Sequence, residues 1–126
     1  IDLGHDFGLP VQLHCCGGFA PLIPLMIDAG LDALHSVQPS CRTMNPAELK
    51  KSFGDRIVFN GAVDSHHVLI TGDRDAVVRG TREVLEIMMP GGRFIGGASH
   101  DTILEETPVE NVVAMFETIR EYGRYA

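Results

Sequence analysis

The stretch Pro10-Val11-Gln12-Leu13-His14-Cys15-Cys16-Gly17-Gly18, together with residues 21–30 that follow it, decides the fold of this chain. Pro10 introduces an extended segment over about residues 11–15, and the two glycines end it. Pro21 then opens a segment with apolar residues at helical spacing, and Gly30 stops it. The sequence therefore predicts a strand followed by a helix, which is one βα unit.

The same order of strand and helix recurs three more times along the chain. Asn45 and Asp73 are placed to cap the second and third helices, and Pro46 is placed at the first position of the second. Thr107 to Glu110 is predicted to be a capping box that opens the last helix. The remaining strands are predicted over residues 33–37, 57–60 and 93–97, and the apolar face of the last helix over Val112, Val113, Phe116 and Ile119.

Four strands that are each followed by a helix must pair in parallel, because parallel neighbours need a crossover of about a dozen residues or more. The fold class is therefore α/β. Two architectures remain possible for this sheet: a doubly wound open sheet, or half of an eight-stranded barrel. A complete barrel usually has about 250 residues, which is about twice the length of this chain. In both architectures, ligands bind at the carboxyl ends of the strands.

Composition limits the class of protein, the partners and the compartment that fit this chain. The 126 residues are 44% hydrophobic and 21% charged, which suits one globular domain, and the net charge of −7 disfavours nucleic acid or an anionic membrane surface as a partner. No apolar run approaches the ~20 residues of a membrane span. Three cysteines without a framework spacing fit a reducing compartment, so a cytoplasmic location is expected. Because the chain begins with Ile1, it is expected to be a piece of a longer protein.

His14 and Cys16 are two residues apart on the first predicted strand, so their side chains project from the same face, and Cys15 projects from the other. An imidazole and a thiolate together suit zinc better than calcium or magnesium. The third ligand is expected to be His100, which follows the last predicted strand. The alternative is a buried histidine beside a structural cysteine.

Three further polar residues are expected near this edge of the sheet. Gln38 is a candidate for substrate contact, with a solvated loop residue as its alternative. Asp64 is the candidate catalytic residue, with a helix or turn cap as its alternative. Asp101 is a candidate for substrate binding, and either Asp101 or Asp64 is a candidate to orient a ligating histidine.

Several short segments of the chain match the motifs of one known family. They are His14–Gly17, Asp32–Pro39, Phe53–Asp55, Asn60–Asp64, Gly91–Ile95, Ser99–His100 and Thr107–Val112. Together they resemble the carboxy-terminal half of the uroporphyrinogen decarboxylase superfamily. Within that superfamily the chain looks closer to the corrinoid-dependent methyltransferases, which carry H-x-C on the fifth barrel strand, than to the decarboxylases, which do not.

The resemblance implies a (β/α)8 barrel, of which this chain over residues 1–126 supplies the last four units. It also implies that His14 and Cys16 are zinc ligands. His100 stands where coenzyme M methyltransferases have a cysteine, and histidine is itself a competent zinc ligand. The implied reaction is methyl transfer between a corrinoid, carried on a separate protein partner, and a small thiol or methylated substrate.

Two other functions remain open from the sequence. The first is metal-free decarboxylation of a polycarboxylate porphyrin precursor, for which Arg42 and Arg93 could contribute to a basic cavity. The second is a non-catalytic half-barrel that associates with the amino-terminal half of a barrel or with a second copy of itself.

Overall fold

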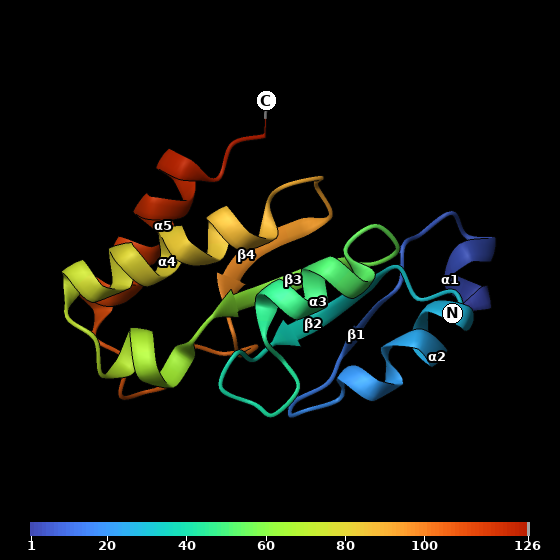
Figure 1. The fold of residues 1–126 in the computed structure, drawn as a ribbon, viewed down its shortest axis with the longest axis horizontal. Helices are drawn as coiled ribbons and strands as arrows, with labels where there is room; N and C mark the ends of the chain where they lie inside the picture. Colours follow the sequence, from blue (N-terminus) through green and yellow to red (C-terminus); the bar gives the residue numbers. More distant parts are fainter. Residues whose placement is uncertain (126) are drawn as a thin grey trace.

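The computed structural model describes residues 1–125 and contains one sheet of four parallel strands (Figure 1). Their order in the sheet is the order in the chain, with β1 at one edge and β4 at the other. The predicted α/β fold is confirmed. The strands are β1 (Gln12–His14), β2 (Ala33–Val37), β3 (Val58–Val63) and β4 (Phe94–Ala98).

A helix follows each strand, as the sequence predicts. These helices are α2 (Ile23–Asp28), α3 (Pro46–Phe53), α4 (Arg74–Met88) and α5 (Val109–Tyr122). Three shorter elements were not predicted: α1 (Asp2–Asp6), the 3-10 turn η1 (Ala20–Leu22) that leads into α2, and the π-helix η2 (Ser65–Ile70) after β3. Within residues 1–125, no helix is long and apolar enough to cross a membrane.

Two of the predicted helix caps are confirmed by hydrogen bonds. The Asn45 side chain accepts from the backbone N–H groups of Ala47 and Glu48, and the Asp73 side chain accepts from that of Ala76. These bonds satisfy donors that have no partner within the helix. The helices therefore begin where their local sequence specifies.

The capping box predicted for α5 is wrong. Pro108 has an extended backbone, with ψ near 133°, and α5 begins one residue later without a side-chain cap. The apolar face predicted for α5 is wrong at Val113 and Phe116, which are 49% and 57% exposed, whereas Ile119 packs against the core as predicted. The helix instead buries a mixed set of residues: Asn111, Ala114, Met115 and Thr118.

The two faces of the sheet have different surroundings. Leu34, Phe59 and Phe94 occupy matching positions on β2, β3 and β4, and all three are buried in one cluster with residues of the surrounding helices. The next residue on each strand points to the opposite face. That face carries His14, His35, Asn60 and Ile95 at matching positions.

Among the described residues, no helix fills this second face, and much of it is polar. Gln12 and His14 are exposed, and the Asn60 amide donates to Gln12 Oε1 at 3.1 Å across the sheet. A four-stranded parallel sheet with helices on one side and an open polar face on the other is the arrangement of half a (β/α)8 barrel. The open face corresponds to the barrel interior.

Candidate functional site

His14 and Cys16 lie at the carboxyl end of β1, and the structure brings their side chains together. His14 Nε2 is 3.2 Å from Cys16 Sγ, and both residues are exposed. Cys15 turns to the opposite side and packs against the apolar core, as the alternation along the strand predicts. The two predicted ligands therefore meet at one point on the open rim of the sheet.

The spacing of this pair fits a shared metal ion. Tetrahedral zinc bound to one imidazole and one thiolate places the two donor atoms roughly 3.5 Å apart. The observed 3.2 Å needs only a small adjustment to reach that separation. The two donor atoms are close enough to reach one zinc ion, and their role as zinc ligands stays a prediction.

The third predicted ligand, His100, is not grouped with this pair. Its Nδ1 is 2.8 Å from Asp101 Oδ1, and the orientation of His100 by Asp101 stays a prediction. Within residues 1–125, no three side chains of His, Cys, Asp and Glu are arranged to hold one metal ion. The three-ligand zinc set stays a prediction, and so does substrate binding by Asp101.

His35 is a neighbour of both parts of the predicted metal site, although it is not among the site residues predicted from the sequence. It pairs with His14 in the register of β1 and β2, and the two Nδ1 atoms are 2.8 Å apart. Burial lowers the pKa of His35, charge on His14 and His100 lowers it further, and the Asp101 carboxylate opposes the shift. His35 therefore lies within electrostatic reach of His14 and of the loop that carries His100.

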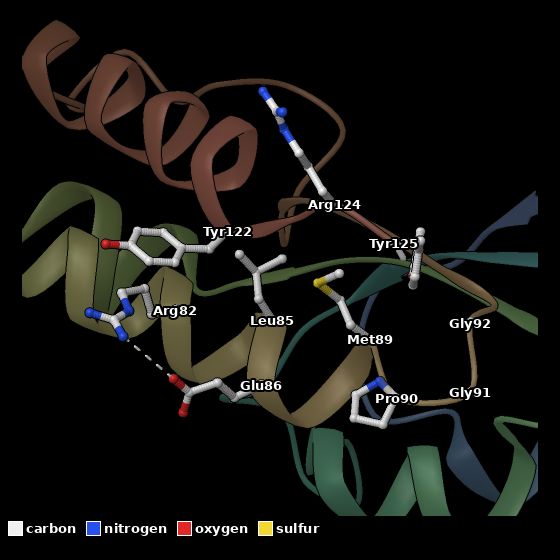
Figure 2. Close-up of a pocket in the computed structure, with 10 residues that line it drawn as sticks. All are labelled: Arg82, Leu85, Glu86, Met89, Pro90, Gly91, Gly92, Tyr122, Arg124 and Tyr125. Carbon is white, nitrogen blue, oxygen red and sulfur yellow. Dashed lines mark ion pairs between the residues drawn. The ribbon is translucent and has the colours of Figure 1, made fainter.

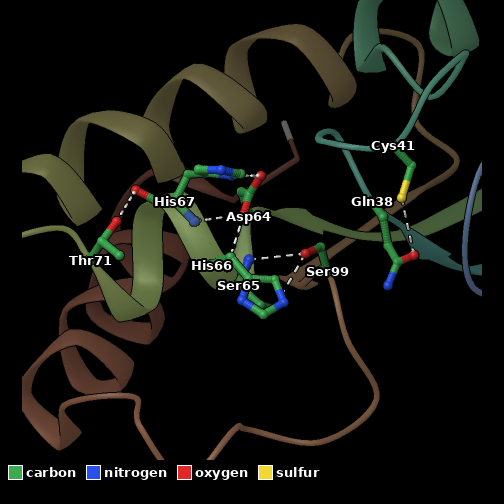
Figure 3. A network of polar contacts seen from close by, with 8 residues as sticks. All are labelled: Gln38, Cys41, Asp64, Ser65, His66, His67, Thr71 and Ser99. Carbon is green, nitrogen blue, oxygen red and sulfur yellow. Dashed lines mark hydrogen bonds and ion pairs between the residues drawn. The ribbon is translucent and has the colours of Figure 1, made fainter.

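Gln38 ties the loop after β1 to the loop after β2. Its Oε1 accepts from the Gly17 backbone N–H at 2.7 Å and from Cys41 Sγ at 3.6 Å. Figure 3 shows the side chain turned toward Cys41. Gln38 is thus a structural tether beside the site, and its contact with substrate stays a prediction.

Asp64 is the cap of η2, which is the alternative that the sequence offered for it. Its carboxylate accepts from the backbone N–H groups of His66 and His67 at 2.9 and 2.8 Å and contacts the His67 ring at 3.1 Å (Figure 3). Burial alone raises the pKa of this carboxyl, but the hydrogen bonds outweigh burial and bring the pKa below its usual value. A catalytic role for Asp64 stays a prediction.

A small polar cavity of about 170 Å³ lies at the carboxyl ends of β2, β3 and β4. Ser65 and Ser99 form its buried part: the Ser65 backbone N–H donates to Ser99 Oγ, which donates to Ser65 Oγ at 3.3 Å (Figure 3). The cavity therefore combines two predicted residues with others that the sequence did not single out. Its lining is Gln38, Ser40, Cys41, Ser65, His66, Ser99 and His100.

The residues that the sequence missed share one property. His35, Ser65 and Ser99 were given no role from the sequence, and each makes its contact with a residue that parallel pairing brings from elsewhere in the chain, His35 with His14 and Ser65 with Ser99. The one available signal is their position, since all three lie at or near the carboxyl end of a predicted strand. Counting outward from the strand ends would have added them to the candidates.

A larger cavity, of about 430 Å³, lies between the end of α4, the turn before β4 and the end of α5 (Figure 2). The Arg82 guanidinium lies 4.4 Å from the centre of the Tyr122 ring at one side of it, and Tyr125 lies at the other. Gly91 and Gly92 precede β4, so this cavity is at the amino ends of the strands. Ligands of parallel α/β folds bind at the opposite ends, which separates this cavity from the candidate site.

The comparison with protein families identifies the group to which the chain belongs. The family model for uroporphyrinogen decarboxylase (URO-D) matches residues 3–122. The chain belongs to the uroporphyrinogen decarboxylase family. The membership predicted from the sequence motifs is thereby confirmed.

Two curated relatives illustrate the similarity of this URO-D family member to decarboxylases. It is 32% identical over 81 residues to uroporphyrinogen decarboxylase of Rickettsia canadensis (strain McKiel), which covers 64% of this chain and 23% of the relative. It is 33% identical over 79 residues to uroporphyrinogen decarboxylase of Rickettsia conorii (strain ATCC VR-613 / Malish 7), with coverage of 63% and 22%. The aligned segments thus span less than a quarter of these relatives.

A solved structure shows the similarity of this URO-D family member to a methyltransferase. The methyltransferase from Methanosarcina mazei superposes with a TM-score of 0.73 and 27% sequence identity, over 98% of this chain and 34% of that chain. Nearly all of this chain therefore matches about a third of the larger protein. The fold is part of a TIM-barrel-like structure, as predicted.

Proposed function

We propose that the protein containing this chain is a zinc-dependent methyltransferase that moves a methyl group between a corrinoid and a small thiol or methylated substrate. The observation that supports the proposal is the His14–Cys16 pair, whose donor atoms are 3.2 Å apart at the carboxyl end of β1. The similarity to the Methanosarcina mazei methyltransferase supports it further. The corrinoid is expected on a separate protein.

The proposed roles of the residues follow from their positions. His14 and Cys16 would hold zinc, with His100 as the third ligand after the loop that follows β4 carries it toward the pair. Zinc with three protein ligands keeps an open position, which lowers the pKa of a bound thiol so that it is a thiolate near neutral pH. Asp101 would orient His100, since their side chains are already 2.8 Å apart.

The small cavity suits the polar part of a substrate. Its volume of about 170 Å³ admits a group of a few heavy atoms, and the Ser65 and Ser99 hydroxyls at its base can donate or accept hydrogen bonds. The Gln38 amide nitrogen is available there because its oxygen is engaged by Gly17 and Cys41. We propose that Gln38 contacts the substrate through this nitrogen.

Decarboxylation of a porphyrin precursor is the second candidate, because the curated relatives carry that name. A polycarboxylate substrate requires several cationic groups around one cavity. Arg42 follows β2, whereas Arg93 precedes β4, so the two guanidinium groups belong to opposite ends of the sheet. This separation favours the methyltransferase.

Metal quantitation on the full-length protein tests the proposal. We expect one zinc per chain in the wild-type protein, much less in Cys16→Ser, and the wild-type amount in the matched control Cys15→Ser, since Cys15 faces the core. Methyl transfer from a free methylated corrinoid to a thiol should follow the metal content. Equal zinc in wild type and Cys16→Ser contradicts the ligand assignment, and turnover of uroporphyrinogen by metal-free protein would support the second candidate.

A further inference from the structure

The contact between His14 and His35 is the least expected feature of the candidate site. Their Nδ1 atoms are 2.8 Å apart, and the ring centres are 4.9 Å apart with the planes inclined by 50°. The two residues face each other because β1 and β2 pair in register at this position. A hydrogen bond between two histidines is therefore built into the sheet.

Such a contact fixes where hydrogen atoms lie. At 2.8 Å, one Nδ1 must carry hydrogen and the other must accept it, because two bare nitrogens or two N–H groups repel each other. If His14 Nδ1 carries the hydrogen, His14 Nε2 has a free electron pair. His14 Nε2 is 3.2 Å from Cys16 Sγ, so the proposed metal ion would contact both atoms.

His35 is suited to act as the acceptor. It is half-buried on β2, which lies between β1 and β3 in the sheet, whereas His14 is exposed on the edge strand β1. A ligating histidine commonly donates its other ring N–H to a fixed acceptor, which sets both tautomer and orientation. A carboxylate often fills this role, but the nearest candidates are engaged elsewhere: Asp101 contacts His100 and Asp64 contacts His67.

We infer that His35 is a positioning residue for His14: it accepts a hydrogen bond from His14 Nδ1 and thereby directs His14 Nε2 to the metal shared with Cys16. The inference rests on the proposed function, since it assigns a role within the same metal site. It adds a residue that touches neither the metal nor the substrate.

Metal binding by variants of the full-length protein tests this inference, with Co²⁺ as the probe. His35→Leu removes the acceptor, and loss of such a partner commonly weakens metal binding by about 10- to 100-fold. His35→Asn offers an amide oxygen close to the position of Nδ1, so it should restore most of the affinity. His67→Leu is the matched control, because His67 is 73% exposed and its ring contacts Asp64 on another element.

The absorption spectrum of bound Co²⁺ separates positioning from ligation. The thiolate-to-cobalt charge-transfer band should persist in His35→Leu at saturating metal, because Cys16 is intact, and should vanish in Cys16→Ser. Wild-type affinity in His35→Leu alongside loss in Cys16→Ser would overturn the role of His35 and leave the proposed function standing. Wild-type affinity in Cys16→Ser would overturn the proposed metal site itself.

A measurement on the wild-type protein covers the case in which His35→Leu does not fold. Nitrogen-15 NMR of the histidine rings in the zinc-loaded protein should show hydrogen on His14 Nδ1 and on His35 Nε2. The reverse tautomers, with hydrogen on His35 Nδ1, would overturn the inference. Equal weakening by His35→Leu and His35→Asn would also contradict it, since hydrogen-bond acceptance would then not be the property that matters.

Discussion

The Asp64 side chain is held as a helix cap by hydrogen bonds from the backbone that follows it. Its carboxylate is 13% exposed and accepts hydrogen bonds from two backbone N–H groups at the start of η2. We expect Asp64→Ala to lower the free energy of unfolding by about 0.5–2 kcal/mol, because a helix cap is lost, and Asp64→Asn to lower it less, because an amide oxygen still accepts. Chemical denaturation of the full-length protein measures both.

The pH dependence of this effect has a defined sign. The native pKa of Asp64 lies below its unfolded value, so the carboxylate stabilises the fold fully above the unfolded value, and this contribution disappears as the pH falls through the lowered native pKa. The difference in stability between wild type and Asp64→Asn should therefore shrink in acid. A difference that grows on acidification would contradict the cap.

Residues that cap helices can be predicted from the sequence, whereas contacts between residues on different strands cannot. Asn45 and Asp73 cap helices within three residues of their own positions, so the sequence alone specifies them. The role of His35 depends on the register between β1 and β2, which no local pattern contains. The His14–Cys16 pair was predictable because both ligands belong to one strand, whereas the placement of His100 depends on a loop.

Asn111 joins two elements that are distant in sequence. Its side-chain amide donates to the backbone carbonyls of Leu69, in η2, and Gly72, in the loop that follows, at 2.9 and 2.8 Å. Asn111→Leu would leave both carbonyls unpaired, one of them in a buried contact, so we expect a loss of roughly 2–3 kcal/mol in the free energy of unfolding.

The exposed neighbour Glu110 provides a matched control for this prediction. Glu110→Gln should change the denaturation midpoint little, because the side chain is solvated. The measurement is the shift of the midpoint at constant slope. A similar small shift for Asn111→Leu would show that α5 and η2 are held together mainly by their apolar contacts.

Elements were predicted well where apolar residues recur regularly, and poorly where they do not. The buried residues of α4 recur at helical spacing, which the sequence alone displays: Val77, Thr81, Leu85 and Met88. The same rule misassigned α5, because this helix buries Asn111 and Thr118 and leaves Val113 and Phe116 exposed. The π-helix was missed because two of its first three residues are adjacent histidines without helical apolar spacing.

The molecule as a whole has two unpartnered edges. One lies along β1, α1 and α2, where Phe7, Leu9 and Leu25 are each more than 60% exposed, and the other lies along β4 and α5, where Phe116 is exposed. We expect the isolated 126-residue chain to self-associate, because both edges present apolar groups and open strand hydrogen bonds. Two copies related by a two-fold axis would bring β1 of each beside β4 of the other and complete eight strands.

Light scattering coupled to size exclusion tests this expectation. The predicted mass is about twice the 13.7 kDa of one chain, or larger if the contacts do not close. Phe116→Glu should shift the population toward the monomer, whereas Arg79→Glu on the exposed side of α4 should not. A stable monomer at high concentration would show that the exposed apolar groups of the two edges do not drive association.

The Gln38 side chain connects two loops at the rim of the sheet through one atom. One oxygen atom serves both the segment that carries Cys16, through Gly17, and the segment that carries Cys41. A substrate held by the amide nitrogen would therefore contact a side chain whose oxygen already anchors the turn that carries Cys16, so one residue would position both the substrate and the thiolate.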